Sequence, residues 1–294
     1  MSTKEVDLPI PPNEPRAASG FVCGEIRGGN EPIHERVAMP GLRGVLYSNP
    51  CRGASGGDLH YISVCGSGLL ARVCLADVAG HGEMIAAVGA EMHALLRRSV
   101  DTIDERKVLT TLDRRLDDTG PHAMTTAVLL TYYPPARRLT VRYAGHPPGW
   151  LYRAGERRWS QLDTPTQPTA GRHADLPLGT GLSPTFTRHR FRVAPGDRLL
   201  LVTDGVLEAS APDGRELGAV GLAALLERSG DRLDSIDQEL LAALRAHVDH
   251  PDLVHDDVTF FAGEFVPGPP GPALWHIVKN RLLSRSVQPE ERQR

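Results

Sequence analysis

The sequence predicts an α+β protein in which strands pair mainly through hairpins and helices are inserted between them in pairs. Two observations support this class. Strand-like and helix-like hydrophobic periodicities alternate along the chain, and neighbouring strand-like segments are separated by only a few turn residues. Paired strands interrupted by paired helices are typical of a layered sandwich in which helices cover antiparallel sheets.

Strand-like segments lie in three parts of the chain. Residues 61–78 contain two apolar runs around a Gly-Ser-Gly turn and predict a β-hairpin. Residues 123–133 and 137–145 predict a second pair of strands joined by a short proline turn. Residues 197–206 form a nearly continuous apolar run that ends soon after an acid, and residues 256–265 predict a closing strand.

Helical spacing appears in two pairs of segments. Residues 83–99 carry apolar side chains at intervals of three and four, and the basic end of this segment suits the negative end of a helix dipole. Residues 104–117 repeat the same spacing. Residues 221–229 and 233–248 predict the second helix pair.

The two ends of the chain differ in composition from the middle. Residues 1–35 are rich in proline, glycine, glutamate and asparagine and predict a flexible N-terminal arm. Residues 36–265 are expected to form one domain, in which the polar, proline-rich stretch 160–195 is the candidate for a flap beside a site. Residues 266–294 begin as a Pro/Gly linker and continue as a basic C-terminal helix or tail.

Composition excludes several classes of function. The 33 basic and 36 acidic side chains give a net charge of −3, so we expect no nucleic-acid partner. We find no apolar run long enough for a membrane span and no apolar region typical of a secretory signal. The 4 cysteines contain no CxxC pair, which predicts reduced thiols rather than a zinc site. These features predict a cytoplasmic protein.

Four aspartates stand at predicted strand ends or beside glycine turns: Asp58, Asp77, Asp204 and Asp256. An ionised carboxylate at the end of an apolar strand is costly unless it is paired, solvated or bound to a metal ion. Gly57 and Gly205 allow sharp turns beside two of these acids and leave space for an ion. Hard divalent cations prefer such oxygen ligands. Each aspartate alone is more often a turn former or helix cap, so the residues by themselves indicate only a candidate metal site.

Seven motifs occur in one order over roughly residues 40–265: GGD at 56–58, DVAGHG at 77–82, TAVLL at 126–130, YAGHPP at 143–148, LPLG at 176–179, GDRLLLVTDGVLEA at 196–209 and DDVT at 256–259. In this order they resemble the type 2C, or PPM, metal-dependent protein phosphatases, and specifically their bacterial SpoIIE-like branch. The resemblance implies an α-β-β-α sandwich of two antiparallel sheets flanked by helix pairs, with metal ions in a cleft at one end.

The resemblance also implies a role for each acid. Asp77 matches the carboxylate that bridges two Mn²⁺ or Mg²⁺ ions, and Asp58 matches a ligand of the second ion. The remaining implied residues are the first-ion ligands Asp204 and Asp256, the backbone carbonyl of Val78, and Asp257 as a support that orients the ligands. A metal-activated water would attack the phosphate ester directly, with Asp77 and Asp58 as the catalytic carboxylates and no covalent phospho-enzyme.

Four positions depart from the family pattern or leave alternatives open. Tyr61 stands where this branch often has a second acid after GGD, which puts the surroundings of the second ion in question. Arg52 is a candidate phosphate-binding residue or a solvated loop residue. His81 is a candidate support near the metals, either as a general acid or as a turn residue. His146 is interpreted as structural, fixing the corner after a strand.

The resulting functional expectation is hydrolysis of phosphoserine or phosphothreonine on a regulatory protein, such as an anti-sigma-factor antagonist. A separate regulatory protein is a further expected partner. Two alternatives remain open on the same fold: a pseudophosphatase that acts as a binding or scaffold module, and a phosphomonoesterase for small molecules. The four matching acids favour catalysis over a scaffold, whereas substrate choice depends on loops that the sequence does not resolve.

Overall fold

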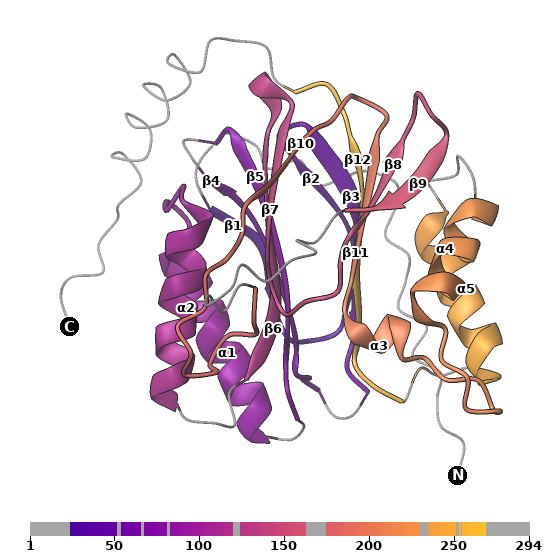
Figure 1. The fold of residues 1–294 in the computed structure, drawn as a ribbon, viewed down its shortest axis with the longest axis horizontal. Coiled ribbons are helices and arrows are strands. Elements are labelled where there is room, and N and C mark those ends of the chain that lie inside the picture. Colours follow the sequence, from indigo (N-terminus) through magenta and orange to yellow (C-terminus); the bar gives the residue numbers. More distant parts are fainter. Residues whose placement is uncertain are drawn as a thin grey trace.

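Two antiparallel sheets face each other, and a pair of helices covers the outer face of each (Figure 1). The computed structural model describes residues 24–51, 54–65, 68–80, 83–119, 124–162, 175–229, 235–250, 253 and 255–268. Within these ranges each sheet contains six strands, and the neighbouring strands of each sheet pair antiparallel. The predicted α+β sandwich with flanking helix pairs is therefore confirmed.

The first sheet holds the pair of strands on which the predicted site is built. Its order is β1 (Gly24–Gly29), β4 (Asp58–Cys65), β5 (Leu70–Val78), β6 (Thr125–Tyr133), β7 (Arg138–Ala144) and β10 (His189–Arg192). The second sheet has the order β2 (Ile33–Met39), β3 (Leu42–Asn49), β12 (Val258–Phe265), β11 (Arg198–Val202), β8 (Trp150–Arg153) and β9 (Arg158–Gln161).

The helices form two outer layers and two short connections. The first sheet is covered by α1 (Glu83–Arg98) and α2 (Glu105–Thr119), and the second by α4 (Gly218–Ser229) and α5 (Ile236–Val248) (Figure 1). The short connections are α3 (Asp204–Leu207) after β11 and the 3-10 turn η2 (Pro134–Ala136) between β6 and β7. No helix among the described residues is both long and apolar enough to cross a membrane.

Strand alternation sorts the core into three layers. Ile62 and Val64 of β4 belong to the cluster between the sheets, whereas Leu59 and Tyr61 belong to the cluster beneath α1 and α2. Successive side chains of a strand point to opposite faces, so the residues of β4 that share the parity of Ile62 face the second sheet. A third cluster fills the space between the second sheet and α4 and α5. This alternation decides to which face of the first sheet the side chains of Asp58 and Asp77 point.

Two boundaries differ from the sequence-based expectation. The segment expected to be a flexible arm to residue 35 contains all of β1 and the first residues of β2, which pair with β4 and β3 as edge strands. Edge strands can be short and polar, so the composition of this segment did not reveal them. The strand expected at 197–206 ends at Val202, because Asp204 and Glu208 close one helical turn through the Glu208 N–H and the Asp204 carbonyl at 2.7 Å. Of the predicted C-terminal linker and helix, only residues 266–268 are described.

Candidate metal-dependent phosphatase site

Asp58 and Asp77 lie directly opposite each other on the neighbouring strands β4 and β5. Both share the parity of residues that pack between the sheets, Ile62 on β4 and Leu75 on β5, so both carboxylates face the second sheet. Asp58 is only 3% exposed. Directly opposed side chains have Cβ atoms about 5 Å apart, and two like charges at this spacing destabilise a sheet. The arrangement is therefore unfavourable for the protein alone and favourable for cation binding.

The second sheet contributes further carboxylates at the same end of the sandwich. Asp204 is the first residue of α3 and follows the end of β11 at Val202 by two residues. Asp256 lies two residues before β12. Glu208, four residues after Asp204, belongs to the same group of charges: burial raises its pKa, and the charges of Asp204 and Asp256 raise it further. Sequence reasoning missed Glu208, although its spacing of one helical turn from Asp204 was a readable signal.

The acids of this group raise one another's pKa values. Burial raises the pKa of Asp77 to about 7, and the further causes are the charges of Asp204, Asp256, Asp257 and Glu208. Burial raises the pKa of Asp58 well above its ordinary range, and the charge of Asp77 adds to this effect. Divalent cations with oxygen ligands would relieve this repulsion, so the donor set fits the ions that the sequence predicts.

A threonine hydroxyl joins the two sheets at the site. Thr203 Oγ1 donates to Asp58 Oδ2 at 2.8 Å, and the Thr259 N–H donates to the same hydroxyl at 3.1 Å. Thr203 and Thr259 are both fully buried. This contact ties the GGD strand to β12 and holds one oxygen of Asp58. Sequence reasoning missed Thr203, because a threonine before an acid has no distinctive pattern.

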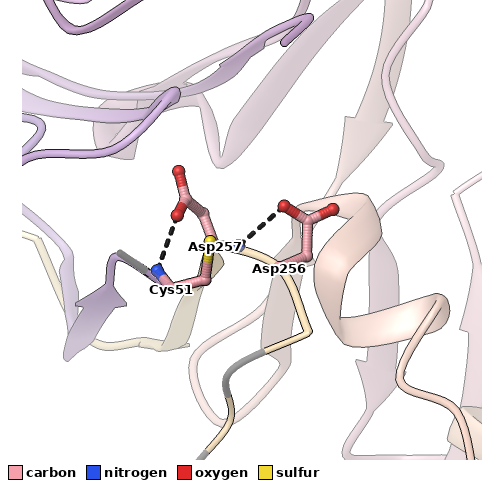
Figure 2. A group of neighbouring side chains, drawn as sticks. All are labelled: Cys51, Asp256 and Asp257. Atoms are coloured by element: carbon pink, nitrogen blue, oxygen red, sulfur yellow. Dashed lines mark hydrogen bonds between the residues drawn. The ribbon is translucent and has the colours of Figure 1, made fainter. Parts of the chain in front are cut away.

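Asp257 organises the loop that leads into β4. Its Oδ1 accepts the Cys51 N–H at 2.7 Å, and its Oδ2 accepts the N–H groups of Gly57 at 2.6 Å and Asp58 at 3.3 Å. Figure 2 shows Asp257 between Cys51 and Asp256. The Asp257 N–H donates to Asp256 Oδ1 at 2.8 Å. These contacts agree with the expected orienting role, although they do not test whether Asp257 also binds a metal ion.

The glycines of the motifs permit close approach at the site. A Cβ on Gly57 would lie 2.8 Å from the Val78 carbonyl oxygen, and a Cβ on Gly205 would collide with the Asp257 carbonyl. A Cβ on Gly57 would also lie 3.5 Å from Asp77 Oδ1, so Gly57 lies beside Asp77. The Val78 carbonyl therefore lies beside the GGD loop and Asp77, as the predicted ligand set requires.

The described residues contain one tight group of potential metal ligands. Ligand atoms of Cys51, Asp256 and Asp257 all lie within 4.8 Å of one another. Among the four predicted aspartate ligands, no three place their ligand atoms this close together. The charges of Asp204 and Asp256 nevertheless act on Asp77 across the sandwich. A two-ion site spreads its ligands around two centres, so a looser arrangement of these four is compatible with the predicted set.

Two of the four positions that departed from the family pattern or left alternatives open, Tyr61 and His146, can now be placed. Tyr61 faces the helix layer on the opposite side of β4 from Asp58, so it is not adjacent to the predicted second ion. His146 is buried, with Nδ1 3.1 Å from Thr126 Oγ1, and Thr126 pairs with Asp77 across β5 and β6. Burial lowers the pKa of His146 to about 3, in keeping with a neutral structural residue. Arg52 and His81 lie outside the described residues.

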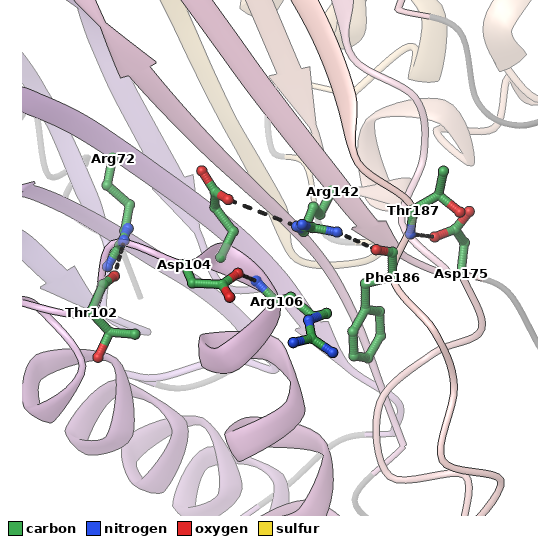
Figure 3. Close-up of polar contacts among 9 residues, drawn as sticks. Arg72, Thr102, Asp104, Arg106, Arg142, Asp175, Phe186 and Thr187 are labelled. Carbon is green, nitrogen blue, oxygen red and sulfur yellow. Dashed lines mark hydrogen bonds and ion pairs between the residues drawn. The ribbon is translucent and has the colours of Figure 1, made fainter.

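The segment expected to form a flap is attached to the helix layer. Residues 163–174 lie outside the described ranges, and residues 189–192 form β10, so they belong to a sheet and not to a flap. Between them, Leu178 and Thr125 exchange backbone hydrogen bonds at 2.8 and 3.0 Å, and the Gly179 N–H donates to Asp113 of α2 at 3.1 Å. Figure 3 shows Arg142 of β7 donating to the Phe186 carbonyl.

The fold and the group of carboxylates together indicate the class of protein. Two antiparallel sheets with helix pairs on both outer faces, and acids between the sheet ends, characterise the phosphatases of the PP2C fold. The family model described as Stage II sporulation protein E (SpoIIE) matches residues 69–265. The chain therefore belongs to the SpoIIE family, the bacterial branch of the PPM, or type 2C, phosphatases.

Individual relatives agree with this assignment. The phosphoserine phosphatase RsbP of Bacillus subtilis is 30% identical over 146 residues, which cover 47% of this chain and 34% of RsbP. The chain thus spans about a third of that relative. The RsbU and RsbW domains of a Mycobacterium tuberculosis protein superpose with a TM-score of 0.65 at 22% identity, covering 82% of this chain and 64% of theirs. RsbX, solved in complex with magnesium, has a TM-score of 0.57 at 15% identity, and the match covers 79% of this chain and 99% of RsbX.

Proposed function

We propose that this chain is a protein-serine/threonine phosphatase that hydrolyses phosphoserine or phosphothreonine on a regulatory protein with two Mn²⁺ or Mg²⁺ ions. The observation that carries this proposal is the direct opposition of Asp58 and Asp77 between the sheets, with Asp204 and Asp256 on the facing sheet. Membership of the SpoIIE family supports the reaction class. The RsbP relative, a phosphoserine phosphatase by name, supports the phosphoserine substrate.

The chain's own residues would hold the ions and the reacting groups in place. In this proposal Asp77 would hold both ions, Asp58 would hold the second ion, and Asp204, Asp256 and the Val78 carbonyl would hold the first. When bound, divalent cations neutralise phosphate oxygens and lower the pKa of a coordinated water. Thr203 keeps one oxygen of Asp58 fixed, and Asp257 keeps the backbone before Asp58 in place. A fixed frame of this kind lowers the reorganisation needed for the reaction.

An anti-sigma-factor antagonist is the proposed type of substrate, and a separate protein would supply regulation. The scaffold alternative predicts metal binding without turnover. The small-molecule alternative predicts turnover of small esters while phosphoproteins stay unchanged. The buried like-charge pair favours metal binding, which the scaffold alternative shares with the proposal, so turnover decides between them.

The test is hydrolysis of p-nitrophenyl phosphate and of phosphoserine peptides by the full chain, with Mn²⁺ and with EDTA. Asp77→Asn and Asp204→Asn should each remove metal-dependent turnover. Asp118→Asn, an exposed aspartate on α2, is the matched control and should keep full activity. Turnover that persists in EDTA or in both site variants would contradict the proposal. Turnover of the small ester with inert phosphopeptides would select the small-molecule alternative.

A further inference from the structure

Cys51 brings a sulfur atom to the edge of the aspartate group. Its Sγ and the carboxylates of Asp256 and Asp257 supply ligand atoms that all lie within 4.8 Å of one another. Figure 2 shows the three side chains together, with Cys51 coming from the segment after β3 and the two acids from the segment before β12. The family motifs of the sequence do not include Cys51, and an all-oxygen site has no need of it.

The backbone fixes the position of this thiol. The Cys51 N–H donates to Asp257 Oδ1 at 2.7 Å, so the residue that carries the sulfur is tied to the acid pair. The approach of the chain around Asp257 is close, because a Cβ on Gly56 or on Gly205 would collide with Asp257 atoms. Cys51 is half-buried and is not in a disulfide. A partly accessible thiol held against two carboxylates is a mixed set of sulfur and oxygen ligands.

From this geometry we infer that Cys51, Asp256 and Asp257 form a site for a thiophilic divalent cation, of which Zn²⁺ is the type. Zn²⁺ takes thiolate and carboxylate ligands at about 2.3 and 2.1 Å in tetrahedral geometry, which places neighbouring ligand atoms roughly 3.5 Å apart. The three ligand atoms already lie within 4.8 Å of one another, so a shift of about 1 Å would bring them to this spacing. The thiol proton would leave to solvent as the sulfur binds, and water would complete the coordination.

The inference rests on the proposed function only through Asp256, which belongs to both ligand sets. Mg²⁺ and Mn²⁺ favour oxygen ligands and gain little from a sulfur, whereas Zn²⁺, Co²⁺ and Cd²⁺ accept it. Because Asp256 is shared, a thiophilic ion bound at Cys51 should compete with the hard ion on the Asp204 side. Cys51 would therefore make the protein selectively sensitive to zinc.

The first test is spectroscopic and needs no turnover. Co²⁺ is added to the metal-free full chain, and the thiolate-to-cobalt charge-transfer band in the near ultraviolet is recorded. We expect the band in the wild type, its loss on addition of EDTA, and its absence in Cys51→Ser. Cys74→Ala is the matched control, because Cys74 is completely buried beneath α1 and α2 and burial raises the pKa of its thiol to about 12. A band of equal strength in Cys51→Ser would overturn the inference.

The second test measures affinity by calorimetry with Zn²⁺ and Mn²⁺ separately. Cys51→Ser should weaken Zn²⁺ binding by at least about tenfold and leave Mn²⁺ binding within about threefold. Equal losses for both ions would overturn the inference, since they would indicate a general disturbance of the loop. Failure of the proposed function has a different signature. A Cys51-dependent cobalt band without any Mn²⁺-dependent turnover would refute the phosphatase and support the thiol site.

Discussion

Asp58 and Asp77 occupy opposed positions on β4 and β5 with both carboxylates directed at the second sheet. The hydroxyl of Thr203 donates to one oxygen of Asp58. Burial raises the pKa of Asp77, and the charges of four further acids raise it more. The pair therefore costs the metal-free protein stability, and that cost is the physical basis of its affinity for cations. The same relationship fixes how the protein should respond to pH.

Metal-free protein should lose stability as the pH rises. The folded-state pKa of Asp77 is about 7, whereas an unfolded aspartate has a pKa of about 4. Between these values the folded protein holds a proton that the unfolded chain has released, so the contribution is fully present below about pH 4 and is lost as the pH passes through about 7. The raised pKa values of Asp58, Asp204 and Glu208 act in the same direction.

Thermal unfolding in EDTA from about pH 5 to about pH 8 measures this effect. The midpoint should fall across the range in the wild type and fall less in Asp77→Asn, which should be the more stable protein at the upper end. Mn²⁺ should restore the wild type there and leave Asp77→Asn little changed. A wild-type midpoint that rises with pH in EDTA would show that these acids do not dominate the pH dependence.

Thr203→Val should destabilise the fold and weaken the site together. Valine has nearly the shape of threonine, but it leaves Asp58 Oδ2 and the Thr259 N–H without their shared partner in a buried position. The expected loss is about 1–3 kcal/mol of unfolding free energy. Thr203→Ser keeps the hydroxyl and should recover most of it. Denaturant unfolding of the two variants decides the matter, and equal losses would assign the effect to packing and not to the hydroxyl.

Gly205→Ala should be disruptive, because its Cβ would collide with the backbone carbonyl of Asp257. Backbone cannot rotate away as a flexible side chain can, so α3 would have to move relative to β12. We expect a loss of about 1–3 kcal/mol or more. Gly155→Ala is the control, since its Cβ would have no atom within 4 Å, and it should stay within about 0.5 kcal/mol of the wild type. Comparable stabilities of the two variants would contradict the close approach.

The sequence predicted the layers of this fold better than its edges. Long periodic segments such as α1, α2 and β6 were recognisable because one face of each is buried and the pattern is continuous. The strands β1, β8, β9 and β10 were not, because they are short and lie at or next to sheet edges, where backbone pairing and not hydrophobic pattern decides the structure. Local pattern does not encode which neighbour completes a sheet.

The candidate site divides in the same way. The aspartates were found because acids beside glycines at strand ends are locally unusual, and the order of the motifs gave them roles. Thr203 was missed because its importance depends on a contact across the sandwich with Asp58. Cys51 was missed because its importance depends on a contact with Asp257, which lies far away in the sequence at the same end of the second sheet. The question that Tyr61 raised was also one of direction. Asp58 and Tyr61 lie three residues apart on one strand, so they point to opposite faces once β4 is known to begin at Asp58.

Asp257→Asn tests whether this residue supports the site or binds the ion itself. The carboxylate accepts three backbone N–H groups, and an asparagine can offer one acceptor oxygen, since its amide group would face the remaining donors. The loop before Asp58 should loosen, and Mn²⁺ affinity should fall by about 10–100-fold, the usual effect of losing a residue that orients ligands. Calorimetry with Mn²⁺ measures this affinity, with Asp118→Asn as the control and Asp204→Asn as the reference for a lost ligand.

If Asp257→Asn binds Mn²⁺ as poorly as Asp204→Asn while its metal-free stability is unchanged, Asp257 is itself a ligand. A large loss of metal-free stability with residual Mn²⁺ binding would instead assign it to the frame of the site, because the three backbone contacts exist whether or not an ion is bound.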